Sequence, residues 1–181
     1  MADVLLVAAT DIELCEHPGL VCGVGPVEAA AATARELAAR APAAVVHVGV
    51  AGARGITPGG IVIGSESVYV DLAAEIPVVD RLEPDSRLLA ATREAVPEAL
   101  VLPIGTSASV GGPTRAGREL RVEAMEGFGV LRACALADVP AIEVRAVSNE
   151  LSEGDRARWR IGRAIEALAD VLPRVLGAAA D

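Results

Sequence analysis

The stretch AAVVHVGVAGARG at residues 43–55 indicates best which kind of fold this chain forms. Its first eight residues are apolar at nearly every position and rich in valine, which predicts a short strand buried on both faces. Sheets covered on both faces are typical of mostly parallel strands that are joined by crossover helices. The glycines that follow predict a turn at the carboxyl end of this strand, where such sheets bind their ligands.

The rest of the chain repeats this alternation of short apolar runs and longer helical patterns. We expect strands at residues 4–9, 43–50, 60–70, 100–106 and 141–148, and helices at 26–41, 85–96, 126–137 and 158–176. A chain of 181 residues without an internal repeat or a linker falls within the range of one domain. The sequence therefore predicts a single α/β domain over residues 1–181, with a mixed, mostly parallel central sheet and helices on both faces.

The composition argues against several kinds of partner. A formal net charge of -9 disfavours nucleic acid and anionic membranes, because proteins that bind them present clustered lysine and arginine. No apolar run is long enough to cross a bilayer, and no basic segment precedes the first apolar run as it would in a signal peptide. Cys15, Cys22 and Cys134 form no CxxC pair, which favours free thiols in a reducing cytoplasm. We expect a cytoplasmic protein that binds a small molecule.

Four segments at predicted strand ends carry residues suited to chemistry. They are TDIE at 10–13, GVAGARG at 49–55, TSASVGG at 106–112 and VSNE at 147–150. The carboxyl ends of parallel strands meet at one edge of a sheet, so these segments should converge on one cleft. The glycines at 49–55 would let a ligand approach the backbone, although an ordinary tight turn explains them equally well. The segment VCGVGPVEAAAA at 21–32 lacks the spacing of a dinucleotide-binding loop.

The segment VEAMEGFGVLRACA at residues 122–135 places Glu123 and Glu126 around Met125 at the start of a predicted helix. Negative charge at a helix N-terminus is often only a cap. A methionine beside a glutamate at a strand end also offers an apolar surface and a bidentate acceptor for vicinal hydroxyls, which suits a ribose. The residues alone leave both interpretations open.

Three of these motifs together resemble the nucleoside phosphorylase and nucleosidase superfamily. They read VGVAGAR at 48–54, VEAMEGFG at 122–129 and RAVSNEL at 145–151, where that superfamily has a GSAGG-like turn, a VEMEA-like segment and a closing RxxSD or RxxSN strand. The extra residue in the second motif, the asparagine in the third and DRARWRIGRAIEAL at 155–168 are similar to the futalosine hydrolase branch. The resemblance covers nearly the whole chain and implies a nucleoside phosphorylase-like fold.

The resemblance also implies roles for individual residues. Glu13 matches the glutamate that activates water, and Asn149 matches the position that binds the base, where an amide suits 6-oxopurines. These two are the expected catalytic residues, and the structural alternatives are an exposed loop glutamate and an asparagine that caps a turn. The expected substrate-binding residues, which include the ribose-binding pair at 125 and 126, are Val50, Ala51, Gly52, Ser109, Val110, Glu123, Met125 and Glu126.

Hydrolysis is expected rather than phosphorolysis. Phosphorylases of this group bind phosphate through an arginine and a serine, and the matching positions here are His47 and Val50. Valine cannot hydrogen-bond a phosphate oxygen, and neutral histidine is a poor substitute for a guanidinium group. We therefore interpret His47 as a core residue. The resemblance implies no metal and no organic cofactor.

The expected reaction is the hydrolysis of futalosine to hypoxanthine and dehypoxanthine futalosine, a step of menaquinone biosynthesis. Arg54 is the candidate for binding the benzoate of the substrate, and Trp159 is interpreted as a packing anchor for the last helix. Few residues separate Glu13 from the segment at 21–32, where relatives insert a helix and strands. Either the partner subunit of a homodimer or higher homo-oligomer covers this gap, or activity is altered or lost. The alternative functions are a nucleosidase acting on inosine, methylthioadenosine or S-adenosylhomocysteine, and a non-catalytic nucleoside-binding protein.

Overall fold

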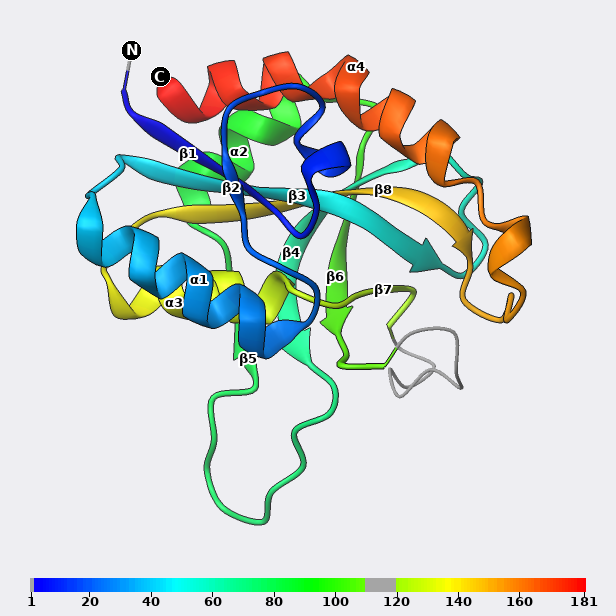
Figure 1. The fold of residues 1–181 in the computed structure, drawn as a ribbon, viewed down its shortest axis with the longest axis horizontal. Helices are drawn as coiled ribbons and strands as arrows, with labels where there is room; N and C mark the ends of the chain where they lie inside the picture. The colour runs from blue at the N-terminus through cyan, green and yellow to red at the C-terminus, as the bar shows by residue number, and fades with distance from the viewer. Residues whose placement is uncertain (1, 110–119) are drawn as a thin grey trace.

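The computed structural model describes residues 2–109 and 120–181, and it places one mixed sheet between two layers of helices (Figure 1). The strands are β1 (Val4–Ala8), β2 (Leu20–Val21), β3 (Ala44–Ala53), β4 (Ile61–Tyr69), β5 (Arg81–Leu82), β6 (Leu100–Thr106), β7 (Val122–Ala124) and β8 (Ala141–Glu150). The helices are α1 (Pro26–Ala39), α2 (Ser86–Ala95), α3 (Gly127–Leu136) and α4 (Ile161–Ala180), with short 3-10 helices η1 (Asp11–Leu14) and η2 (Arg156–Arg158).

The central strand β3 changes its partner along its length. Its first half pairs in parallel with β1, while β8 pairs in parallel with nearly all of it. At Gly52 and Ala53, beyond the end of β1, the antiparallel strand β7 pairs with β3 instead. β8 also pairs with β4, β4 with β6, and β6 with β7, so five strands form a closed ring of pairings. The predicted mixed sheet with helices on both faces is confirmed.

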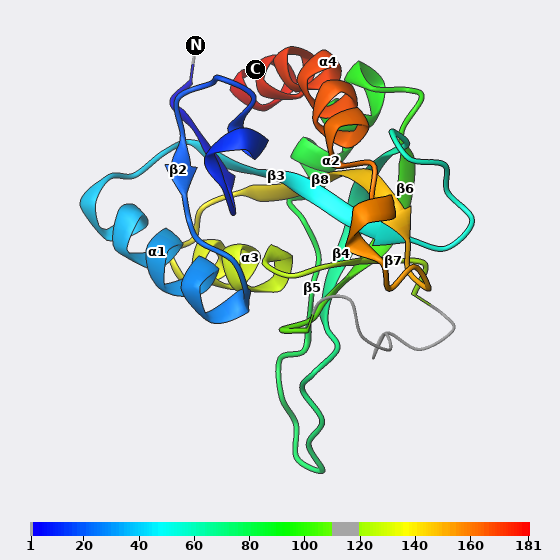
Figure 2. The same ribbon diagram turned by 45° about the vertical axis from the view of Figure 1, so that its right-hand side comes forward.

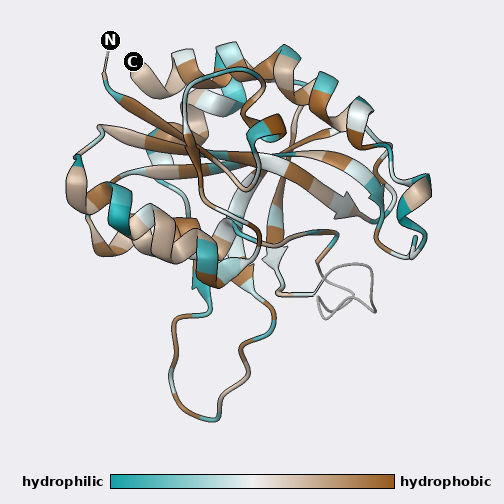
Figure 3. Ribbon diagram, viewed as in Figure 1, coloured by the Kyte–Doolittle hydropathy of each residue, from teal (hydrophilic) through white to brown (hydrophobic). Residues whose placement is uncertain are grey.

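The helices cover the two faces in pairs. α2 and α4 pack on one face, and α1 and α3 pack together on the other (Figure 2). The side chains of α4 that are buried recur every three or four positions, as on one face of an amphipathic helix. Figure 3 shows the resulting alternation of hydrophilic and hydrophobic residues along α1 and α4. Within the described part of the chain, no helix is both long and apolar enough to cross a membrane.

One predicted turn and one predicted strand end are wrong. The glycine-rich residues 49–53 are not a turn but continue β3, because β7 and β8 supply hydrogen-bonding partners there. In the same way β8 runs on to Glu150, so Asn149 lies within a strand. The pairing shifts register between Ala51 and Gly52, and within residues 49–55 only Gly55 has a positive φ, of 63°. Residues 50–52 and Asn149 are therefore held by the sheet rather than by a loop.

Two further boundaries also differ from the prediction. Glu123 belongs to β7, so it does not stand at the start of a helix. The last helix begins at Ile161, after η2 and two extended or irregular residues, and it ends at Ala180. Asp155 explains the delay, because its side chain accepts a hydrogen bond from the Ala157 N–H and so caps η2 separately.

Candidate active site

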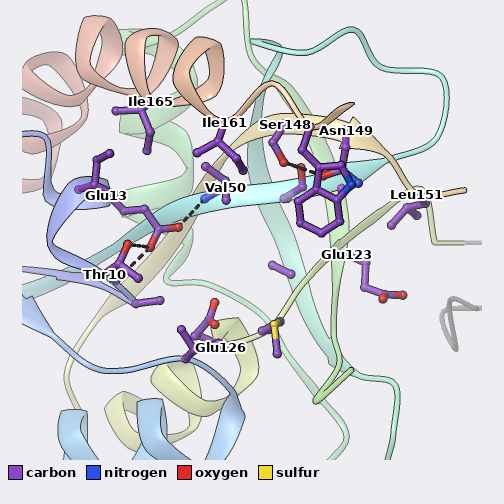
Figure 4. Close-up of a pocket in the computed structure, with 18 of the residues that line it drawn as sticks. Thr10, Glu13, Val50, Glu123, Glu126, Ser148, Asn149, Leu151, Ile161 and Ile165 are labelled. Carbon is purple, nitrogen blue, oxygen red and sulfur yellow. Dashed lines mark hydrogen bonds between the residues drawn. The ribbon is translucent and has the colours of Figure 1, made fainter. Parts of the chain in front are cut away.

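A cavity of about 260 Å³ lies at the carboxyl ends of β1, β3 and β8 (Figure 4). It brings together all the expected catalytic and ribose- or base-binding residues except Val110, which lies outside the described residues; the benzoate candidate Arg54 does not line it. The predicted residues that line it are Glu13, Val50, Ala51, Gly52, Ser109, Glu123, Met125, Glu126 and Asn149. Further apolar side chains that line it include Ile12, Val24, Leu151, Ile161 and Ile165. Glu13 and Asn149 lie on opposite sides of the cavity, with Glu126 between them and below (Figure 4). We call these two sides the carboxylate end and the amide end.

The change of partner along β3 creates the carboxylate end. β1 stops at Ala8 while β3 continues, so the Val50 N–H extends beyond the strand that would have accepted its hydrogen bond. The Glu13 carboxylate takes that place, since its Oε1 accepts from the Val50 N–H at 2.9 Å. A side chain therefore substitutes for a strand at this point, and it faces the cavity.

Glu13 is 6% exposed, which excludes the alternative of an exposed loop glutamate. Its Oε2 accepts hydrogen bonds from the Thr10 N–H at 3.0 Å and from the Thr10 hydroxyl at 2.7 Å. A carboxylate offers about four acceptor positions, and these contacts with Val50 and Thr10 fill about three. The remaining position is on Oε1, beside the cavity, where it is suited to hold a water molecule.

Glu126 does not act as the helix cap that its position suggested. Its side chain makes no cap hydrogen bond to α3, and it is 4% exposed. Oε1 accepts instead from the Gly25 N–H at 3.1 Å, and Oε2 lies 3.5 Å from Arg145 Nη2. Burial raises the pKa of Glu126 above its ordinary value, against the lowering effects of Arg145 and of the Gly25 N–H.

A buried ionic cluster under the carboxylate end was missed by the sequence analysis. Arg145 is fully buried, and its Nε donates to Glu143 Oε1 at 2.8 Å. Its Nη2 donates to Nε2 of His47, which in turn donates from Nδ1 to the Val7 carbonyl at 3.0 Å. Burial lowers the pKa of His47 well below its ordinary value, with a further contribution from Arg145. The signal in the sequence is the pair of charges at alternate positions of an apolar strand, AIEVRAV at 141–147.

The amide end is built from consecutive residues of β8. Asn149 is 8% exposed, and its Oδ1 accepts from the Ser148 hydroxyl at 2.7 Å. Its Nδ2 donates to the Glu150 carbonyl at 3.0 Å, which leaves the second amide hydrogen available toward the cavity. Because Asn149 lies inside a strand, it does not cap a turn.

Trp159 lines this same cavity, so its interpretation as a packing anchor for the last helix is wrong. The indole Nε1 donates to the Glu153 carbonyl at 3.0 Å. The next residue, Arg160, donates its N–H to the Ser148 carbonyl at 2.8 Å, which holds the tryptophan beside the amide end. Trp159 is the only tryptophan of the chain, so its fluorescence reports on this site alone.

Arg54 is not among the described residues that line the cavity. Its Nη1 donates to the Leu120 carbonyl at 3.2 Å, which gives no support to a role in binding the benzoate. In the part of the chain that the structure describes, no group of three or more His, Cys, Asp and Glu is arranged to hold a metal ion.

Comparisons with known proteins identify the family and agree with the fold. Residues 12–179 match the family described as the Phosphorylase superfamily. The chain is 37% identical to the futalosine hydrolase of Streptomyces coelicolor over 183 residues, which covers 86% of this chain and 77% of that relative. The structure of a 5'-methylthioadenosine/S-adenosylhomocysteine nucleosidase from Colwellia psychrerythraea in complex with adenine has a TM-score of 0.87. It is 20% identical and covers 98% of this chain and 96% of its own.

A futalosine hydrolase structure from Helicobacter pylori has the same fold, with a TM-score of 0.84 and 16% identity. The alignment covers 96% of this chain and 97% of that chain. The resemblance that the three sequence motifs carried is thereby confirmed. From its motifs, its fold and a family match over nearly its whole length, this chain belongs to the phosphorylase superfamily.

Proposed function

We propose that this protein hydrolyses the N-glycosidic bond of futalosine and releases hypoxanthine and dehypoxanthine futalosine, a step of menaquinone biosynthesis. The observation that carries the proposal is the placement of Glu13, Glu126 and Asn149 around one cavity. Together they supply an acceptor for water, an acceptor for ribose hydroxyls and an amide for the base. The 37% identity to a futalosine hydrolase supports the choice of substrate.

Glu13 is the residue that would activate water. The hydrogen bonds from Thr10 and Val50 fix its carboxylate and leave an acceptor position on Oε1. A water molecule that donates to this position loses its proton to the carboxylate as its oxygen attacks the anomeric carbon. General base catalysis of this kind contributes about 10²–10⁴-fold to a rate.

Glu126 is the residue that would bind the ribose. Gly25 and Arg145 occupy part of its acceptor capacity, so positions remain for two vicinal hydroxyls. When the glycosidic bond breaks, positive charge develops on the sugar ring. Carboxylates on the same side of the cavity stabilise that charge more than they stabilise the neutral substrate, which is the condition for catalysis.

The amide end would receive the leaving base. The free amide hydrogen of Asn149 can donate to O6 or N7 of a 6-oxopurine and so stabilise negative charge on the departing ring. The indole of Trp159 offers a flat apolar surface in the same part of the cavity, suited to stacking on a purine. Hypoxanthine can accept a hydrogen bond from the amide and stack on the indole.

Water rather than phosphate is the nucleophile that this cavity favours. The Val50 N–H already donates to Glu13, and His47 Nε2 already accepts from Arg145. Neither group is therefore available to donate to a phosphate oxygen. The carboxylates of Glu13 and Glu126 would also repel an anion in this space.

The test is to incubate the purified protein with futalosine, inosine and methylthioadenosine, each with and without phosphate, and to measure the released base. We expect hypoxanthine from futalosine, at a rate that phosphate does not change and without a sugar 1-phosphate product. A sugar phosphate product would make the protein a phosphorylase. Preferred cleavage of inosine or methylthioadenosine would make it a different nucleosidase. Quenching of Trp159 fluorescence without release of any base would support a binding protein.

The assembly of the protein is a second part of this proposal. Ile12, Val24 and Val27 are 61%, 56% and 75% exposed, and the first two line the cavity. We expect a second copy of the chain to cover this apolar edge, as in a homodimer or a higher homo-oligomer. Light scattering on the purified protein measures the oligomeric state directly, and a monomer that is fully active would contradict this expectation.

A further inference from the structure

The ionic cluster under the carboxylate end has no assigned role in the chemistry described above. Arg145 and Glu143 lie on β8, and His47 lies on β3. The exposed fractions of these three residues are 0%, 1% and 0%. Charged groups are seldom buried so completely unless they are paired, and unpaired burial is costly. A buried arginine, glutamate and neutral histidine beneath two candidate catalytic carboxylates therefore call for a functional explanation.

Two glycines show how closely the cluster fits against the carboxylate end. A Cβ atom on Gly49 would lie 2.2 Å from Arg145 Nη1 and 2.8 Å from Glu13 Oε1. A Cβ atom on Gly127 would lie 2.2 Å from Glu143 Oε2. No side chain fits at either position without a shift of the cluster, so the guanidinium lies directly under Glu13 and the Glu143 carboxylate lies against the first turn of α3.

The guanidinium forms no two-point pair with either carboxylate that faces the cavity. A buried arginine beside a carboxylate ordinarily forms a two-point pair with it. Arg145 instead divides its donors: Nε donates to Glu143, and Nη2 donates to His47 and, over a longer distance of 3.5 Å, to Glu126 Oε2. Nη1 makes no hydrogen bond within the described part of the chain, although Glu13 is its neighbour.

We propose that His47 and Glu143 are positioning residues that clamp Arg145, keep its Nη1 from pairing with Glu13 and limit its contact with Glu126 to one long hydrogen bond. The positive charge then stays close enough to make two buried carboxylates tolerable. It leaves the acceptor position on Glu13 Oε1 to water and takes only one acceptor position of Glu126. This inference rests on the proposed function, because it assigns a purpose to the free acceptor positions of those carboxylates.

His47 suits this task in one protonation state only. Its Nδ1 hydrogen is committed to the Val7 carbonyl, so Nε2 carries the lone pair that receives the Arg145 donor. A protonated imidazole would carry a hydrogen on Nε2 as well, so it could not accept the hydrogen bond from Arg145 and the clamp would be lost. The titratable and charged groups that face the cluster are Glu13, Cys22, Glu126, Glu143 and Arg145.

The main test compares His47→Leu with His47→Gln. Leucine removes the acceptor, so Arg145 should turn toward Glu13 and Glu126, occupy their acceptor positions and lower the pKa of Glu126. We expect kcat to fall about 10- to 100-fold with KM within about threefold, since displacement of a catalytic group by about 1 Å can cost 10²-fold. The acid limb of the pH profile should move to lower pH. Glutamine keeps an acceptor near the place of Nε2, so it should restore most of the activity and the acid limb.

A matched control and a second variant separate positioning from stability. Thr92→Val alters another buried polar group without a hydrogen-bond partner, in α2 and away from the cavity, and should change neither kcat nor the acid limb. Glu143→Gln loosens the clamp from the other side and should act like His47→Leu. Lysine lacks the planar guanidinium that His47 and Glu143 hold. In an Arg145→Lys background, His47→Leu should therefore lower kcat much less than it does in the unmodified protein, because both changes act through that one group.

A readout without catalysis completes the test. The chain has two histidines, so nitrogen-15 NMR of the unmodified protein can assign His47, which we expect as the Nδ1–H tautomer over the range in which the protein stays folded. The proposal would be overturned if His47 were the Nε2–H tautomer or charged. Additive effects of His47→Leu and Arg145→Lys on kcat would also overturn it. Failure of the proposed function would appear differently, as no release of hypoxanthine from futalosine by the unmodified protein.

Discussion

The two ends of the cavity are held by contacts of very different range. At the carboxylate end, Glu13 bonds to Val50, 37 residues away, and Glu126 bonds to Gly25, 101 residues away. At the amide end, both side-chain partners of Asn149 are its immediate neighbours in β8. The geometry for bond cleavage therefore depends on the whole fold, whereas the group that meets the base depends on one short piece of strand. Base choice should be easier to alter than catalysis.

The largest expected effect comes from Glu13→Gln. The amide keeps the shape of the carboxylate but cannot accept the proton of water, so kcat should fall about 10²–10⁴-fold. Nucleoside affinity should stay within about tenfold, because the amide end is untouched. Hypoxanthine release measures the first quantity, and quenching of Trp159 fluorescence measures the second. Near-normal turnover would remove Glu13 from the mechanism.

A smaller change, in specificity, is expected from Asn149→Asp. The amide donates to O6 of a 6-oxopurine, whereas an ionised carboxylate repels that oxygen and a protonated one donates to N7 of adenine. Loss of a buried donor costs on the order of 1–3 kcal/mol, so the preference should shift by roughly 10- to 150-fold toward 6-aminopurine nucleosides. The measurement is kcat/KM of both proteins on paired 6-oxo and 6-amino substrates.

The comparison of the two ends also predicts how Asn149→Asp affects stability. Because Asn149 bonds only to neighbours in β8, the free energy of unfolding should change little on Asn149→Asp. An unchanged substrate ratio would assign Asn149 a structural role. A large loss of stability would show that the amide end is not held locally.

Gly49→Ala is expected to disturb the carboxylate end more modestly. The added Cβ would lie 2.2 Å from Arg145 Nη1 and 2.8 Å from Glu13 Oε1, so both side chains must shift. Overpacking of this kind costs about 1–3 kcal/mol of unfolding free energy, and we expect kcat to fall about tenfold. Urea denaturation and hypoxanthine release measure the two effects.

Gly177→Ala is the matched control for this variant. It lies in α4, and no atom lies within 4 Å of its added Cβ. It should raise the unfolding free energy by about 0.4–1 kcal/mol and leave kcat unchanged. Equal behaviour of the two alanine variants would contradict the close fit of the cluster under Glu13.

The fold was predictable from sequence because its strands are apolar at nearly every position. The predicted bounds 100–106 match β6, and the helix at 85–96 differs from α2 by one residue at each end. The errors cluster where a strand gains a partner from far along the chain. Glycines at 49–53 resemble a turn until β7 is known to pair beside them, and a local pattern contains no information about that pairing.

The sequence motifs identified residues of the site but not how their side chains contact one another. The resemblance pointed to Glu13, Glu126 and Asn149, whose positions in the cavity the structure shows. It did not reveal the cluster of His47 and Arg145, because which buried charge faces which depends on the packing of β3 against β8. The position of Trp159 in the cavity could not be predicted either, because it depends on η2 and on the late start of α4, which place this residue beside β8.

The smallest expected effect is a pH dependence that separates the two ends. Ionised Glu126 is needed to accept ribose hydroxyls, and burial raises its pKa above the ordinary value of 4.5. As pH falls through this raised pKa, kcat/KM for futalosine should decline, by about twofold where pH equals the pKa. Hypoxanthine binding, followed by Trp159 fluorescence, should stay nearly flat over the same range because the Asn149 amide does not titrate.

The effect of Glu126 on stability should have the opposite sign. A carboxyl group whose pKa is higher in the folded protein than in the unfolded chain stabilises the fold at low pH and loses that contribution as pH rises through the folded pKa. Replacement by Glu126→Gln should therefore raise the unfolding free energy, relative to the unmodified protein, increasingly as pH rises through that value. Denaturation of both proteins across the acid range measures this difference. A difference that does not grow with pH would mean that Arg145 and the Gly25 N–H compensate the burial of Glu126 fully. The carboxylate end would then titrate like the surface of the protein, and the acid decline of kcat/KM would have to come from another group.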